Sequence, residues 1–202
     1  MALAYSDTGL SRDRIDEPLH RITFCVVDVE TTGWDPQTDA LTEVAAARFT
    51  AGYPCGTFHS LVDPGIPIPP VVSELTGIDD AMVRGAPDLS EALAGLTDLI
   101  GDAVVVGHNI EFDLSFIDVA RAKFALSPLR NPAVDTLHLA RRLVRDDVLN
   151  CSLATLARRL RLDHRPCHRA LEDVLATADL LHAMIERATG YGVFSLRDLL
   201  SF

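Results

Sequence analysis

The chain has 202 residues, of which 48% are hydrophobic and 23% charged, and its formal net charge is −11. This length allows one domain with a sizeable core and no need for disulfides or a structural metal, and no apolar run approaches the roughly 20 residues of a membrane span. The negative charge argues against a protein that holds nucleic acid through a large basic surface, because that mode of binding neutralises phosphates with Lys and Arg. A substrate that carries phosphates would therefore need help from bound cations.

The two ends of the chain differ in character from its middle. Residues 1–20 are polar and lack the apolar segment of roughly 7 to 15 residues that a signal peptide needs, so we expect a flexible N-terminal tail and a cytoplasmic protein. Residues 21–190 should form the main domain, and residues 191–202 a short C-terminal segment. The four cysteines show no CxxC spacing, which predicts reduced thiols rather than a disulfide framework.

The first part of the main domain has the pattern of three strands. Residues 21–30 are apolar on both alternating faces, which is typical of a central strand covered on both sides. Residues 41–49 and 56–62 predict two more strands of a meander, separated by the turn-like segment AGYPC. The proline-rich residues 63–70 should then interrupt regular structure.

The rest of the domain has the pattern of helices with short strands between them. Residues 103–106 predict a short strand, and a further strand or helix start is expected within residues 133–143. Helical patterns cover residues 71–100, with a cap at Asp88 or Ser90, and then 111–124, 152–160 and 169–188. Three strands followed by strands interleaved with helices predict an α/β domain, with a mixed sheet flanked by helices.

Two carboxylates, Asp28 and Glu30, stand two residues apart at the end of the first predicted strand. Side chains alternate along a strand, so both should lie on one face, about 7 Å apart. Ionised neighbours repel each other, and no Lys or Arg lies between residues 24 and 39 to compensate them. The pair predicts either a site for a divalent cation or, because the pattern is short and common, a solvated strand end.

Two further acids stand at the predicted starts of helices. Asp113 closes the segment GHNIEFD and falls in a first helical turn, where the helix dipole favours an acid with or without a ligand. Asp173 closes the segment CHRALED and lies on a helical stripe that is otherwise apolar or small. Asp173 should therefore point inward and need a partner.

Together these three segments resemble the DEDDh family of 3′-to-5′ exonucleases, in the branch that holds the proofreading ε subunit of bacterial DNA polymerase III and the exonuclease domain of Gram-positive replicative polymerases. The segments DVETTG, HNIEFD and HRALED stand where the family has DxExTG, HNxxFD and HxxxxD. The resemblance extends from about Arg21 to Ala188, and it implies a ribonuclease H-like mixed sheet flanked by helices.

The resemblance also implies a chemistry. Asp28, Glu30, Asp113 and Asp173 would hold two Mg²⁺ or Mn²⁺ ions, hard cations that prefer oxygen ligands and would neutralise four carboxylates. His168 would accept a proton from the water that attacks the phosphodiester. The expected products are a 5′-mononucleotide and a strand that is one nucleotide shorter.

Neighbouring residues of the first two motifs are expected to contact the terminal nucleotide; these are Thr31, Thr32, Gly33, His108, Asn109 and Phe112. Each of three of these residues also has a structural explanation. Gly33 could be needed for the turn, His108 could cap the helix, and Phe112 could belong to the core.

The expected substrate is a single-stranded DNA 3′ end, in proofreading or repair, and the expected partner is the polymerase III α subunit. An RNA-trimming enzyme and a non-catalytic binding module are the alternatives, and the segment after residue 190 either docks on a polymerase or merely packs.

Overall fold

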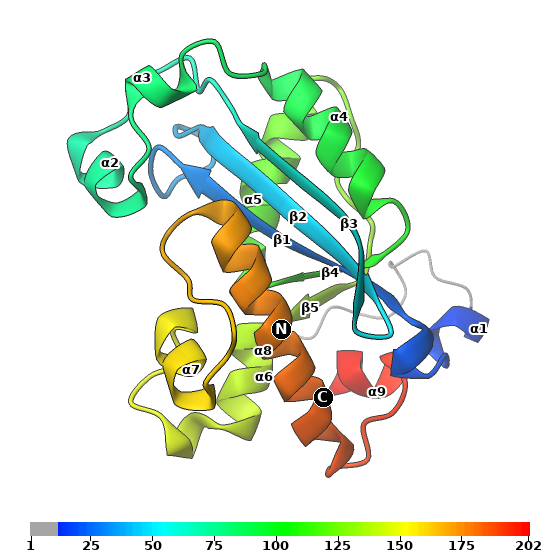
Figure 1. Cartoon of the computed structure of the whole chain (residues 1–202). Coiled ribbons are helices and arrows are strands. Elements are labelled where there is room, and N and C mark those ends of the chain that lie inside the picture. The colour runs from blue at the N-terminus through cyan, green and yellow to red at the C-terminus, as the bar shows by residue number, and fades with distance from the viewer. Residues whose placement is uncertain (1–11) are drawn as a thin grey trace.

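A five-stranded mixed sheet forms the centre of the protein, whose computed structural model describes residues 12–202 (Figure 1). Its strand order is β3-β2-β1-β4-β5. The strands are β1 (Thr23–Thr31), β2 (Leu41–Thr50), β3 (Tyr53–Leu61), β4 (Val104–Gly107) and β5 (Ala133–Asp135). Because β1 pairs antiparallel with β2 and parallel with β4, the predicted mixed sheet is confirmed.

The three-stranded meander forms as its sequence pattern predicts. Alternate residues of β1 enter separate cores: Phe24 and Val26 lie in one, and Cys25 and Val27 in the other. The turn from β2 to β3 consists of Ala51 and Gly52 alone, both with positive φ, as a tight two-residue hairpin requires. The third strand consequently begins at residue 53, three residues earlier than expected.

Helices cover both faces of the sheet (Figure 1). On one face lie α4 (Leu89–Ile100) and α5 (Ile110–Ala122), which share a buried apolar cluster with Val27 and Val29. The other face is covered by α6 (Thr136–Leu143) and α8 (Ala170–Thr189). The short η2 (Arg145–Asp147) follows α6, and α7 (Leu153–Leu160) packs against α8. No helix between residues 12 and 202 has the length and apolarity to cross a membrane. The layered α/β architecture therefore follows the sequence prediction.

The segment predicted to be helical over residues 71–100 is divided into three helices. These are α2 (Pro70–Thr76), α3 (Asp80–Val83) and α4. Gly77 ends α2 in the left-handed conformation, and the Asp79 side chain caps α3. Of the two predicted caps, Asp88 is the one that accepts a hydrogen bond from the Glu91 amide.

The prediction of a loose tail over residues 1–20 is wrong for residues 12–20; residues 1–11 lie outside the described part. Residues 12–15 form α1 (Arg12–Ile15), and η1 (Leu19–Arg21) leads into the sheet. The Leu19 amide donates to Phe194 O, and Leu196 N donates to Glu17 O. The polar pattern hid this packing because its partner lies at the other end of the chain.

The C-terminal segment packs on the domain through α9 (Leu196–Ser201). Leu196 and Leu199 are buried in the same core as α8. Ser195 and Asp198 form a capping box that starts the helix. Packing therefore accounts for Leu196 and Leu199, whereas Tyr191 and Phe194 remain exposed.

Candidate active site

The three motifs meet in one hollow of about 180 Å³ at the carboxyl end of β1. β1 contributes two acids, the first turn of α5 a third, and α8 with its preceding loop a fourth acid and a histidine. The hollow is lined by all five residues with predicted chemistry: Asp28, Glu30, Asp113, His168 and Asp173. Residues up to 145 positions apart in the sequence thus share one site.

The two acids of β1 point to the face that α8 covers. They continue the alternation that places Phe24 and Val26 in the core beneath α8. Both side chains are half-buried, because the sheet covers them on one side and the hollow opens on the other. The prediction that Asp28 and Glu30 share one face is therefore confirmed.

Asp113 is buried against β1, where its carboxylate binds a backbone amide that has no partner in β4. β1 pairs with β4 only as far as Val26, so the Val29 amide has no partner in β4. Asp113 Oδ1 accepts a hydrogen bond from that amide at 3.0 Å. The carboxylate thus fixes the start of α5 against β1 while it lines the hollow.

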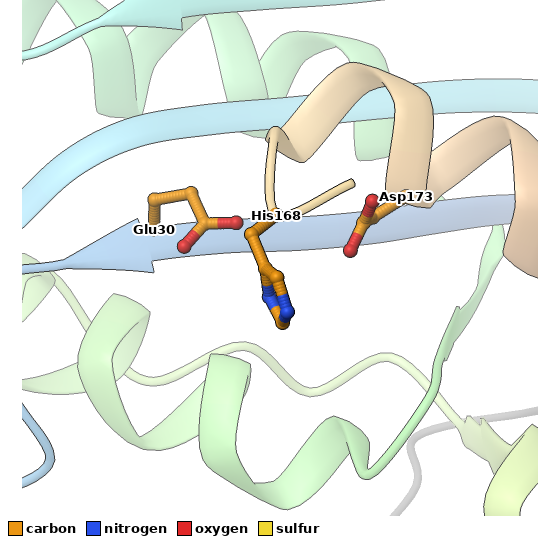
Figure 2. Close-up of side chains that lie close together, drawn as sticks. All are labelled: Glu30, His168 and Asp173. Carbon is orange, nitrogen blue, oxygen red and sulfur yellow. The ribbon is translucent and has the colours of Figure 1, made fainter. Parts of the chain in front are cut away.

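His168 and Asp173 approach Glu30 from the start of α8, as Figure 2 shows. Ligand atoms of Glu30, His168 and Asp173 all lie within 4.8 Å of one another. Asp173 is buried and accepts a hydrogen bond from the Cys167 amide at 2.8 Å, whereas His168 is exposed. His168 has φ +60, an uncommon conformation for a residue other than glycine. The tightest cluster of possible ligand atoms therefore includes the histidine as well as two acids.

Desolvation raises the pKa values of all four acids of the hollow, and repulsion between these acids adds to the effect at Asp28 and Glu30. Desolvation, followed by the charges of Asp113 and Asp173, raises the pKa of Asp28 well above its ordinary value. Desolvation and then the charge of Asp173 raise the pKa of Glu30 to about 8. The pKa of Asp113 is raised by desolvation to about 8, although the hydrogen bond from Val29 opposes it. Desolvation likewise raises the pKa of Asp173.

This donor set fits a divalent metal ion. Carboxylates in a half-buried hollow with raised pKa values release their protons when a cation replaces them. Magnesium and manganese prefer carboxylate oxygens. Asp28, Glu30, Asp113 and Asp173 are the residues that would hold such ions, and which oxygens would bind stays a prediction.

In EDTA the protein should lose stability as the pH rises from about 5 to about 8. The pKa values of Glu30 and Asp113 are raised to about 8, so the folded state keeps protons that the unfolded chain has released in this range. Stability falls with pH wherever the folded state binds more protons. The melting temperature, measured by circular dichroism, should therefore fall, and Mg²⁺ or Mn²⁺ should raise it most at pH 8. A melting temperature in EDTA that rises over this range would contradict the prediction.

Four of the six residues predicted to contact the nucleotide line the hollow; these are Thr31, Gly33, Asn109 and Phe112. A Cβ on Gly33 would stand 2.4 Å from Asp39 Oδ2, so close packing also requires a glycine there. Thr32 does not reach the hollow: it is buried, and its hydroxyl accepts a hydrogen bond from Ala40 N.

His108 lines the hollow, but both of its ring nitrogens have protein partners. Nδ1 lies 3.0 Å from the Thr136 hydroxyl, and Nε2 donates to Cys151 O at 2.9 Å. Desolvation lowers the pKa of His108, so the neutral ring is favoured. The ring therefore connects the second motif to α6 and to the start of α7, which supports the structural interpretation over contact with a nucleotide.

Trp34 and Glu43 are among the residues of the site region that the sequence interpretation missed. Trp34 lines the hollow and is 76% exposed as a residue, and its ring centroid lies 6.2 Å from that of Phe112. Glu43 is fully buried and is the partner of Glu30 in the β1–β2 register. The available signals were a lone tryptophan directly after the first motif and a single acid within an apolar strand.

A mixed sheet with four acids and a histidine gathered at the end of its central strand defines a nuclease of the ribonuclease H-like class. A family model described as an exonuclease (RNase_T) matches residues 25–181. The chain belongs to this exonuclease family, which confirms the resemblance found in its motifs.

Curated relatives include proteins with DNA polymerase III names. The DNA polymerase III subunit epsilon of Aquifex aeolicus is 36% identical, over 88% of this chain and 89% of its own length. A candidate bifunctional exonuclease/endonuclease of Mycobacterium tuberculosis is 39% identical over 91% of this chain. A PolC-type DNA polymerase III of Caldanaerobacter subterraneus is 37% identical over 87% of this chain. The chain spans 30% of the Mycobacterium protein and 12% of the PolC-type polymerase.

Solved structures share the fold. Exonuclease I of E. coli, in complex with a dT13 oligonucleotide, superimposes with a TM-score of 0.76 at 20% identity, over 85% of this chain and 43% of its own. Exonuclease X, in complex with 5′-overhanging duplex DNA, gives a TM-score of 0.69 at 25% identity over 87% of this chain and 97% of its own. The predicted ribonuclease H-like fold is confirmed by the first of these matches.

Proposed function

We propose that this protein is a 3′-to-5′ exonuclease that removes 5′-mononucleotides from DNA 3′ ends. The observation that carries the proposal is the convergence of Asp28, Glu30, Asp113, His168 and Asp173 on one hollow. No other described part of the chain brings three acidic, histidine or cysteine ligand atoms as close together as Glu30, His168 and Asp173. The proposal gives all five residues one shared task.

Each residue of the hollow has a role in this reaction. Two bound Mg²⁺ or Mn²⁺ ions would stabilise the attacking and the leaving oxygen of the phosphodiester. Asp28, Glu30, Asp113 and Asp173 supply the carboxylates that bind them. His168 accepts the proton of the attacking water, and its exposed position lets it pass that proton to solvent. The proton thus leaves the site without crossing the buried acids.

The mouth of the hollow suits a single strand of any sequence. Trp34 and Phe112 present aromatic rings there, and Val72 and Leu75 of α2 add apolar surface. Stacking on aromatic rings tolerates every base, as an exonuclease needs. We propose a single-stranded DNA 3′ end as substrate because two of the relatives are named as DNA polymerase III proteins.

The same similarity supports a cellular setting. We propose that the protein works in the cytoplasm in proofreading or repair, with a DNA polymerase III α subunit as partner. Size-exclusion chromatography of the protein mixed with that subunit tests the partnership, and separate elution at micromolar concentrations would contradict it.

Digestion of matched 5′-labelled DNA and RNA oligonucleotides tests the function. With Mg²⁺ or Mn²⁺ we expect a ladder that shortens DNA from its 3′ end, and no ladder in EDTA or with the Asp28→Ala variant. Faster degradation of RNA would assign the protein to RNA trimming. No metal-dependent cleavage of either strand would replace the catalytic proposal with a binding module.

Replacing Trp34 by alanine should raise KM for a short single-stranded oligonucleotide about tenfold and change kcat less. Base stacking on an aromatic ring contributes about 1–3 kcal/mol per base, and tenfold corresponds to about 1.4 kcal/mol. Steady-state kinetics on a DNA oligonucleotide measure both constants. Tyr53→Ala removes an equally exposed aromatic ring on β3 that does not line the hollow, and should leave KM unchanged. Equal effects of the two substitutions would contradict this role.

A further inference from the structure

A buried carboxylate lies next to the candidate active site without lining it. Glu43 on β2 is fully buried and faces Glu30 across the β1–β2 pair. Its oxygens accept hydrogen bonds from Arg169 Nη2 at 2.7 Å, from Arg169 Nε at 3.2 Å and from Ala170 N at 2.8 Å. His59 Nε2 lies 2.7 Å from the same carboxylate. Glu43 therefore joins β2 and β3 to the start of α8.

The free-energy cost of burying the Glu43 carboxylate indicates that this residue does more than stabilise the fold. Removing a carboxylate from water costs several kcal/mol, and an apolar residue of similar size is often at least as stabilising at such a position. Desolvation acts to raise the pKa of Glu43, but the hydrogen bonds from Arg169, His59 and Ala170 outweigh it and lower the pKa. The negative charge of Glu43 is therefore available to bind the Arg169 guanidinium.

The residues that Glu43 binds follow His168 directly. The left-handed backbone of His168 is unfavourable for a residue with a Cβ and has to be maintained by its neighbours. Before His168, Cys167 N donates to Asp173 Oδ1. After it, Arg169 and Ala170 are bound to Glu43. Both flanks of the histidine are therefore tied down, one to α8 and one to the sheet.

Glu43 also replaces a missing cap. Arg169 is the N-cap residue of α8 and makes no side-chain capping bond. The first helical amide, Ala170 N, donates instead to Glu43 Oε2 at 2.8 Å. Because Asp173 lies in the first turn of α8, the same hydrogen bond places that acid as well.

We propose that Glu43 is a positioning residue of the active site, which holds the loop of His168 and the first turn of α8 in place through Arg169 and Ala170. This inference rests on the proposed function. Glu43 does not line the hollow, so it acts on the reaction only through these residues.

The Glu43→Gln variant tests the proposal. We expect kcat for DNA digestion to fall about 10- to 100-fold, the range for partners that orient an active-site group, with KM nearly unchanged. The matched control is Glu172→Gln, which removes an exposed charge from the same helical turn. This control should keep the wild-type kcat.

A double-mutant cycle separates positioning from general destabilisation. If Glu43 acts mainly through His168, the Glu43→Gln change should cost little further activity in a His168→Ala enzyme. An equal loss of kcat in both backgrounds would overturn the role of Glu43 at His168, and no loss in either background would overturn the whole proposal. If Glu43→Gln does not fold, Arg169→Lys replaces it: lysine keeps the charge but not the two-pronged contact, and kcat should again fall.

Hydrogen exchange keeps this test separate from that of the function. In the Glu43→Gln protein the Ala170 amide should lose protection while the amides of β1 and β2 keep theirs. Unchanged protection of Ala170 would overturn the positioning role even in an active enzyme. A wild-type protein without nuclease activity would overturn the proposed function, and with it the catalytic part of the inference.

Discussion

The Asp28→Asn variant is expected to lose at least about 10³-fold in kcat for DNA digestion. Desolvation, and then the charges of Asp113, Asp173, Glu30 and Glu43, raise the pKa of Asp28 well above its ordinary value. Asparagine keeps the size of the side chain but removes the negative charge that would bind a divalent ion. Charge stabilisation by a bound metal contributes several kcal/mol to the transition state, and each 1.36 kcal/mol is tenfold in rate.

The same substitution should stabilise the protein in EDTA. The neutral amide that replaces the Asp28 carboxylate would no longer repel the neighbouring acids. The melting temperature at pH 8 should therefore rise, and its fall between pH 5 and pH 8 should become smaller. The control is Asp102→Asn, which removes an exposed acid paired with Arg14 and Arg48 just before β4, at the other end of that strand. Full activity of Asp28→Asn with Mg²⁺ would refute its role as a ligand.

The His168→Ala variant should lose about 10²- to 10⁴-fold in kcat, the usual contribution of a general base. KM and the affinity for Mn²⁺, measured by isothermal titration calorimetry, should change far less, since the four acids remain. The loss should be smaller for a substrate whose leaving group is more reactive, provided that chemistry limits the rate.

His164 provides the matched control for that experiment. It is an exposed histidine in the same loop, four residues before His168, and its ring and amide both contact Asp179 Oδ2. His164→Ala should therefore lose a surface contact and keep its activity. A loss of Mn²⁺ affinity in His168→Ala as large as the loss of kcat would make the histidine a metal ligand, which its distance from Glu30 and Asp173 allows.

Local patterns predicted the class of the fold and the members of the candidate site. The alternation along β1 required Asp28 and Glu30 to share a face, and the change from a strand period to a helix period located α5 and α8 with their acids. These patterns involve residues within a few positions of one another. A single sequence is therefore sufficient to read them, and the family match then confirms what the three motifs imply together.

Contacts between distant segments could not be read in this way. Glu43 lies 126 positions from Arg169 in the sequence. The two residues can form an ion pair only because the fold places β2 beside the start of α8. His108 likewise finds its second partner 43 residues away, at Cys151 O. A lone acid in an apolar strand signals that some partner exists, but it does not name the partner.

The amino-acid sequence was enough to determine that this chain forms an α/β domain with four acids and a histidine in exonuclease motifs, because periodicity and motif spacing are local properties. The tertiary structure decided which residues these side chains meet and how they are held. In the folded chain, Asp113 is buried and binds the Val29 amide of β1, and both ring nitrogens of His108 have protein partners. The loop of His168 is held next to Glu43 through the Ala170 amide. The physical reason is that burial, pKa and hydrogen bonding depend on the neighbours in space, which only the packed chain defines.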